Sequence, residues 1–108
     1  MNLFEAELDN GTFLLAGVRY DTRVAISGRV TIGIRPEALR IESGTRASVS
    51  WIEALGAHFL VGLKLDGTVL TALVRSRPAA DRLEISVDPA DIHVFDNESG
   101  KNLRSARH

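Results

Sequence analysis

Apolar and polar residues alternate along most of the chain, in short runs separated by turn residues. The first run, LFEAELD, places Phe4, Ala6 and Leu8 on one side, as expected of a strand with one buried face. It is followed by Asn10-Gly11, a dipeptide that favours the type I′ turn of a β-hairpin. The pattern therefore predicts a hairpin in which TFLLAGVRY is the second strand.

Later parts of the chain repeat this alternation. RVAI and VTIGI are β-branched runs, which favour strands, and the Ser27-Gly28 pair between them is a turn signal. RASVSWIEAL places Ala47, Val49 and Trp51 on one predicted face. The other predicted strands are AHFLVGLKLD, TVLTALV, RLEISV and HVF. The Asp-Gly pair between the first two of these predicts a second hairpin turn.

The spacing of these runs indicates a fold class. About eight short strands, with turn signals roughly every eight to twelve residues, are typical of a small barrel or sandwich. No stretch keeps a helical period long enough to compete. The loop-like segment SRPAAD (residues 76–81) lies inside the pattern, and no linker-like segment divides the chain. We therefore expect one all-β domain over residues 1–108, folded as a small OB-like barrel.

Two proline-containing segments interrupt the alternation in the same way. They are IGIRPEALRI and ISVDPADIHVF. Arg35 and Asp88 each precede a proline and are thereby restricted to extended backbone, so a strand should end at each. Proline suits the first position of a helical turn because its φ angle is fixed and it has no N–H group. We expect two one-turn helical corners, with Leu39 and Ile92 pointing back to close the barrel end.

Composition narrows the class of protein. Hydrophobic residues make up 44% of the chain and charged residues 25%, as in globular domains. The chain has 13 Lys and Arg against 14 Asp and Glu, which gives no general attraction for nucleic acid or anionic membranes. There is no cysteine, which agrees with a reducing compartment. The basic residues near the C-terminus, Lys101, Arg104, Arg107 and His108, are expected to form a solvated terminus.

The sequence lacks the common motifs of catalytic chemistry. It has no GxxxxGK[ST], GxGxxG, GxSxG or HExxH motif. His58, His93 and His108 are too scattered to indicate a metal site. Trp51 and Tyr20 could stack on bases in an oligonucleotide-binding barrel, but the neutral charge favours core packing for both. The residues therefore indicate neither an enzyme nor a metal site, and they argue against nucleic-acid binding.

Three motifs along the chain fit one known family together: GIRPEAL, a Leu-Gly pair before a strand in WIEALGAHFLVGLKL, and DPADIHVFDNESGK. With them the chain resembles the C-terminal TOBE (transport-associated OB) region of ATP-binding subunits of sugar-type ABC importers, the maltose and sn-glycerol-3-phosphate class. The resemblance covers nearly the whole chain. The motif positions, expected to be structural, are Gly33, Arg35, Pro36, Glu37, Leu55, Gly56, Asp88, Pro89, His93, Phe95, Asp96, Gly100 and Lys101.

The resemblance implies a regulatory and dimerisation module that works beside nucleotide-binding domains. The implied partners are a second copy of the chain, the ATPase domain of the parent subunit, a possible regulatory protein and, indirectly, the membrane subunits. The family's Walker and signature motifs have no counterpart here, so ATP and Mg²⁺ would bind only in the parent subunit's ATPase domain. The resemblance implies an excised domain, located in the cytoplasm at the inner face of the cell membrane.

The residues are also compatible with a different function, the binding of a small ligand. A small stand-alone barrel of this kind could bind an oxyanion or a sugar phosphate, and Arg35, Arg40 or Arg46 could hold such an anion. The solute carried by a parent transporter does not follow from the sequence.

Overall fold

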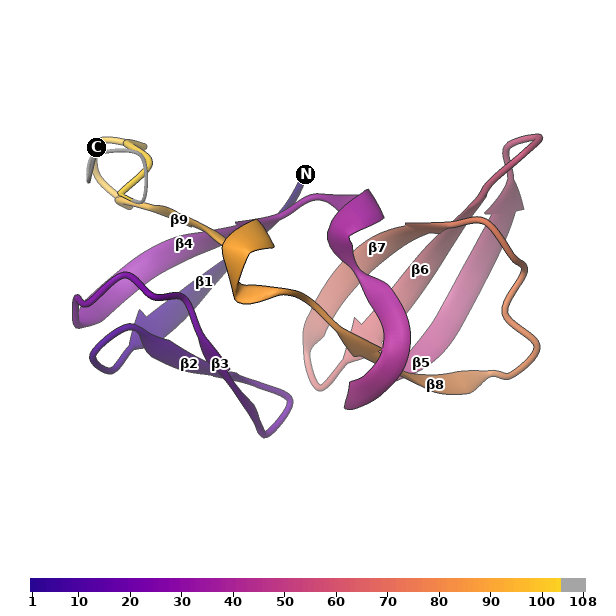
Figure 1. Cartoon of the computed structure of the whole chain (residues 1–108), viewed down its shortest axis with the longest axis horizontal. Helices are drawn as coiled ribbons and strands as arrows, with labels where there is room; N and C mark the ends of the chain where they lie inside the picture. The colour runs from indigo at the N-terminus through magenta and orange to yellow at the C-terminus, as the bar shows by residue number, and fades with distance from the viewer. Residues whose placement is uncertain (104–108) are drawn as a thin grey trace.

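The computed structural model describes residues 1–103, which form nine strands and two single-turn 3-10 helices (Figure 1). The elements are β1 (Asn2–Leu8), β2 (Thr12–Leu15), β3 (Val18–Asp21), β4 (Gly28–Ile34), η1 (Pro36–Ala38), β5 (Arg40–Ala54), β6 (Phe59–Leu65), β7 (Thr68–Val74), β8 (Arg82–Ser86), η2 (Pro89–Asp91) and β9 (His93–Phe95). The all-β class and both helical corners are confirmed. Of the predicted basic terminus, only Lys101 lies among the described residues.

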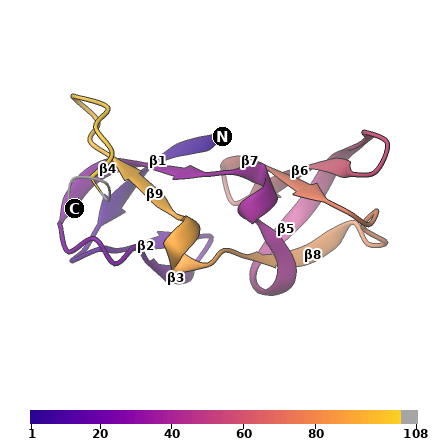
Figure 2. The ribbon, with the colours of Figure 1, turned by 45° about the horizontal axis from the view of Figure 1, so that its top comes forward.

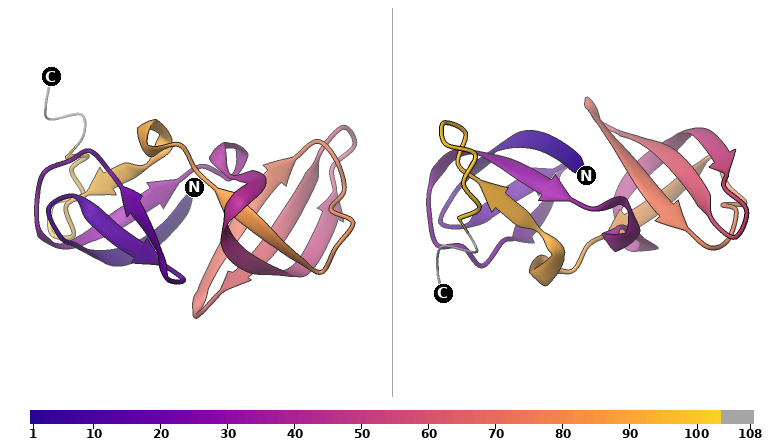
Figure 3. Two further views of the ribbon diagram at one scale, coloured as in Figure 1. Left: turned by 60° about the horizontal axis from the view of Figure 1, so that its bottom comes forward. Right: turned by 90° about the horizontal axis from the view of Figure 1, so that it is seen from above.

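The strands form three antiparallel sheets in two halves of an elongated molecule. Sheet β1-β4-β9 and the two-stranded sheet β2-β3 make one half, and sheet β7-β6-β5-β8 makes the other. The helical turns η1 and η2 lie between the halves (Figures 1 and 2). Two further views show the same division (Figure 3). Within residues 1–103, no helix is long and apolar enough to cross a membrane.

The sheets of residues 1–103 are not closed into the barrel that we expected. One reason is that β2 and β3 pair with each other in a separate sheet. Another is that a side chain occupies the outer edge of β7. The side-chain nitrogen Nδ2 of Asn2 donates to the Thr71 carbonyl oxygen over 2.8 Å, and the Thr71 backbone N–H donates to Asn2 Oδ1 over 2.8 Å. Asn2 thus satisfies backbone groups that a neighbouring strand would pair in a closed barrel.

The predicted first hairpin is wrong in its pairing. Strand β1 pairs with β4 along its whole length, and TFLLAGVRY forms a hairpin of its own. The turn of that hairpin is Ala16-Gly17, where both residues have positive φ angles (49° and 85°). Asn10 and Gly11 also have positive φ angles, so the turn itself is confirmed. The Gly11 N–H, however, donates to the carbonyl of Ile26, which fixes this turn against a later segment.

Two other predictions from the pattern need correction. RVAI is not a strand, although its Val24 side chain is buried. Trp51 does not share the inward face of Ala47 and Val49, because the pairing of β5 with β6 shifts by one residue between Val49 and Trp51. Such a bulge moves every later side chain to the opposite face. Trp51 is consequently 45% exposed, and the next residue along, Ile52, packs against the core instead.

One hydrophobic core runs through both halves. It includes residues from all three sheets, and Leu39 and Ile92, the predicted inward-pointing residues of the two corners, are both buried in it. Each large aliphatic side chain buried in this way contributes roughly 1.5–3 kcal/mol. A buried polar contact also joins the halves, between the hydroxyl groups of Tyr20 on β3 and Thr45 on β5. The two halves therefore share their interior.

Candidate functional site

The first and third family motifs shape the two corners. Arg35 and Asp88 both have extended backbone, with φ and ψ of −69° and 143° and of −66° and 134°, and a proline begins the helical turn after each. The Asp88 carboxylate accepts a hydrogen bond from the Ala90 N–H over 2.9 Å, while Arg35 makes no such capping bond. The side chains of Arg35 and Glu37 are exposed. Both corners therefore orient strands and leave these charges in solvent.

The end of the third motif forms a closed turn. The Asp96 N–H donates to the Lys101 carbonyl over 2.9 Å, and the Gly100 N–H donates to the Asp96 carbonyl over 2.8 Å. Asp96 Oδ1 accepts a further bond from the Glu98 N–H. Gly100 has a φ angle of +71°, a conformation that glycine adopts without strain. Within this turn Lys101 contributes its backbone, and its side chain is exposed.

Gly33 lies under a cluster of apolar side chains on sheet β1-β4-β9. A Cβ atom at this position would lie 2.7 Å from the sulfur of Met1 and from a ring carbon of Phe95, and 3.2 Å from Leu3. Met1 and Leu3 are 49% and 61% exposed. With Phe95 they line an open hollow of about 360 Å³. His93 stacks on Phe95 with ring centroids 6.2 Å apart.

The second motif forms the connection from β5 to β6. The Leu55 N–H donates to the His58 carbonyl over 2.8 Å, and Gly56 has a φ angle of +81°. The Leu55 side chain is 50% exposed. The motif positions thus lie at five separate places in the fold. Among residues 1–103, no group of three His, Asp or Glu side chains is placed to hold a metal ion.

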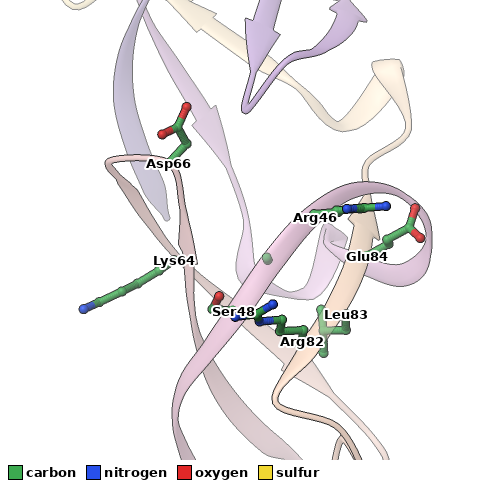
Figure 4. Close-up of a pocket in the computed structure, with 8 residues that line it drawn as sticks. Arg46, Ser48, Lys64, Asp66, Arg82, Leu83 and Glu84 are labelled. Atoms are coloured by element: carbon green, nitrogen blue, oxygen red, sulfur yellow. The ribbon is translucent and has the colours of Figure 1, made fainter.

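A charged hollow of about 480 Å³ lies over β5, β6 and β8 (Figure 4). It is lined by Arg46, Ser48, Lys64, Asp66, Arg82 and Glu84, with Ala47 and Leu83. Positive and negative groups are mixed, and the Lys64 side chain points away from Arg46. Glu84 already accepts the Gly44 N–H over 3.0 Å.

The predicted anion-binding arginines are not brought together around this hollow. Arg46 lines it, whereas Arg35 precedes η1 and Arg40 begins β5. An anion site gains from several donors that converge on one point. The three arginines do not form such a site.

Sequence reasoning missed the surface centred on Trp51. Directly paired residues of neighbouring strands share a face, so the register places three rows on the side of β5, β6 and β7 that faces away from the core. The rows are Ser48, Lys64 and Val69; Trp51, Gly62 and Thr71; and Glu53, Leu60 and Leu73. We call this surface the Trp51 face. Val69 is 65% exposed and Trp51 45%. The only sequence signal for it was Gly62, a glycine inside a strand, which often marks a close approach.

These features define a small all-β module in which most of the motif residues lie in turns and corners. Residues 32–95 match the family described as the TOBE domain. The chain belongs to the TOBE domain family, so the resemblance seen in the sequence is confirmed.

Several curated proteins are similar to nearly the whole chain. The sn-glycerol-3-phosphate import ATP-binding protein of Ruegeria pomeroyi is 38% identical over 95% of this chain and 32% of its own length. The sulfoquinovosyl glycerol transport ATP-binding protein of Agrobacterium fabrum is 33% identical over 88% of this chain and 29% of its own. The xylose/arabinose import ATP-binding protein of Haloferax volcanii is 34% identical over 97% and 32%. The chain spans about a third of the length of these relatives.

Proposed function

We propose that this chain is the regulatory and pairing domain of the ATP-binding subunit of an ABC importer for sugars or related solutes. The observation that carries the proposal is the similarity over 95% of the chain to a subunit whose name states ATP binding and import. The relatives named above differ in their solutes, from sn-glycerol-3-phosphate to pentoses. The proposal therefore names the class of transporter and leaves the solute open.

The proposed action is mechanical. The ATPase domain of the parent subunit would bind ATP and Mg²⁺, and this domain would hold two such subunits together while their ATPase domains open and close. A shared core and hydrogen bonds between the halves make the domain a rigid platform. A regulatory protein that binds this platform in one state of the pair would shift the population toward that state. The complex would lie at the inner face of the cell membrane, in contact with its membrane subunits.

The surface of the domain supports a role in protein contacts. Met1 and Leu3 are exposed on one half, and Trp51 and Val69 on the other. Exposed large apolar residues that are grouped on one face are a feature of interaction surfaces. Two separate apolar areas fit a domain that contacts both its own ATPase domain and a second subunit.

An immunoblot of the native organism tests the proposal first. An antibody raised against this chain should detect a polypeptide about three times its length, as the relatives are, and should co-precipitate it with membrane transport subunits. Purified, that polypeptide should be dimeric by sedimentation velocity. A band at 11.8 kDa, or a strictly monomeric parent subunit, would contradict the proposal. In the first case, titration with sulfate, molybdate and sugar phosphates would test the anion-binding alternative by the heat released.

A further inference from the structure

We propose that the Trp51 face is the surface through which two copies of this domain pair, face to face, about a two-fold axis that passes over Trp51. This inference rests on the proposed function and adds to it the residues that make the contact.

The first argument is that two separate features hold Trp51 outside the core. The bulge after Val49 turns the side chain outward, and Gly62 on the neighbouring strand leaves space beneath it. A Cβ atom at Gly62 would lie 2.2 Å from the indole nitrogen, so the ring lies directly against β6. Bulges often re-aim a side chain at a functional surface. A tryptophan fixed in this way is a rigid apolar anchor, the kind of residue that dominates protein interfaces.

The second argument is the position of two charges around the tryptophan. Glu53 and Lys64 lie on adjacent strands, one row to either side of the row that contains Trp51. Neither takes part in an ion pair within residues 1–103, where the pair described joins Arg29 to Glu5. A two-fold axis that lies between two such faces and crosses above Trp51 places Glu53 of each copy opposite Lys64 of the other. For these two residues the charges of the two copies are complementary. Arg82, which pairs with Ser48, adds to the positive end of the face.

The same symmetry matches apolar residues. Rows of side chains on one face lie roughly 7 Å apart along a strand, and strands lie roughly 5 Å apart. With these spacings the axis brings Val69 of one copy over Leu60 of the partner copy. Val69 is 65% exposed in a single copy. Pairing would thus cover the most exposed large apolar residue of the described chain.

The third argument concerns the edge of the sheet. A free edge strand invites pairing of backbone with backbone, but the Asn2 side chain occupies both the N–H and the carbonyl of Thr71 on β7. Two copies can still contact each other through the side chains on the face of the sheet. The face covers only a few hundred Å² per copy, below the roughly 800 Å² per partner of a standard interface. We therefore expect the isolated domain to pair weakly.

Sedimentation equilibrium of the 108-residue chain, between about 10 µM and 1 mM, tests the inference. Trp51→Glu should weaken pairing roughly tenfold or more, as removal of a central anchor does. Leu14→Glu is the matched control, because Leu14 is 64% exposed on β2 and lies outside the Trp51 face, and it should leave the Kd unchanged. Far-ultraviolet circular dichroism confirms that each variant is folded.

A charge exchange gives a test that does not depend on Trp51. Glu53→Lys alone and Lys64→Glu alone should each weaken self-pairing roughly three- to tenfold, since both contacts of the pair become repulsive. An equal mixture of these two variants should pair at least as well as the native chain, because each opposed pair of charges is then attractive. The double variant should recover native pairing.

The outcomes separate the inference from the proposed function. Native-like pairing of Trp51→Glu, or a mixture no better than its components, overturns the Trp51 face as the contact. A chain that stays monomeric at 1 mM also overturns it, even if the full-length subunit is dimeric. A monomeric full-length subunit overturns the proposed function as well.

Discussion

Gly62 and Gly33 occupy similar places in the two halves of the molecule, but they lie under different kinds of cover. Each lies inside a strand and under large apolar side chains. The cover over Gly33 comes from three parts of the chain, Met1, Leu3 and Phe95. The three atoms that lie nearest to a Cβ at Gly62 all belong to Trp51. A glycine in a strand thus marks the close approach of a side chain in both halves. The residues around it distinguish the two sites.

The polar groups around the two glycines differ in whether they have partners within one copy of the chain. On the sheet that contains Gly33, the Thr31 hydroxyl donates to Asn97 over 2.6 Å and Arg29 pairs with Glu5. These polar and charged groups thus have partners within one copy. On the Trp51 face, Glu53 and Lys64 make no ion pair within residues 1–103. Two opposite charges without an ion pair, one on either side of an apolar anchor, suit a partner outside the chain.

The largest expected effect concerns the link between the halves. Tyr20→Phe removes the partner of the Thr45 hydroxyl, which is fully buried. An unsatisfied buried hydroxyl costs about 2 kcal/mol, so urea denaturation should show that loss in a single transition of both halves. Tyr20→Phe combined with Thr45→Val should cost less than the sum of the two single changes. An unchanged midpoint for Tyr20→Phe would show that the halves are not coupled through this contact.

A smaller effect is expected at Gly62. Gly62→Ala places a methyl group where the indole ring lies, so the ring must leave β6. We expect a loss of about 1 kcal/mol in the free energy of unfolding, a red shift of the tryptophan emission and weaker pairing. Retention of native emission and native pairing would contradict the description of Trp51 as an anchor held by Gly62.

Gly33→Ala is the matched control for that change. The atoms that a new methyl group would meet there include the far ends of the flexible Met1 and Leu3 side chains. Met1 and Leu3 can shift, but the ring of Phe95 would also lie 2.7 Å from the new methyl group and must move as well, so the cost should be about 1 kcal/mol. Pairing and tryptophan emission should not change, since Gly33 lies in the other half of the molecule. A loss of pairing in this variant would place the contact on sheet β1-β4-β9 instead.

The smallest effect compares the two sets of charges. Arg29 and Glu5 are 3.4 Å apart, and their side chains are 62% and 57% exposed. Exposed pairs of this kind contribute less than about 1 kcal/mol. Glu5→Gln should change the thermal midpoint by no more than about 4 °C and leave pairing unchanged, whereas Glu53→Lys should weaken pairing. Equal effects of the two changes on pairing would mean that only net charge matters.

Local signals in the sequence predicted local structure well. The proline corners and the Asn10-Gly11 and Asp66-Gly67 turns follow from residue chemistry, and the structure confirms them. The pairing of β1 with β4 could not be predicted, because a turn dipeptide does not say which strand will lie beside the first. The family resemblance rested on motif residues, most of which lie in turns and corners, while Gly33, His93 and Phe95 lie in strands.

The candidate surface was harder to predict, for a physical reason. A one-residue bulge leaves the alternation of the sequence almost unchanged, yet it reverses the face of every later side chain. Simple alternation therefore placed Trp51 in the core, and only the register between β5 and β6 shows that it is outside. The same register shows that Glu53 and Lys64 lie in the rows on either side of Trp51.

Tryptophan emission as a function of protein concentration tests the central claim most directly. Trp51 is the only tryptophan in the chain, so its emission reports on this one position without a label. Pairing through the Trp51 face should shift the emission maximum to shorter wavelength as the concentration rises from about 10 µM to 1 mM, in step with the mass measured by sedimentation. Dimerisation with an unchanged emission maximum would contradict the account, because the two copies would then meet elsewhere.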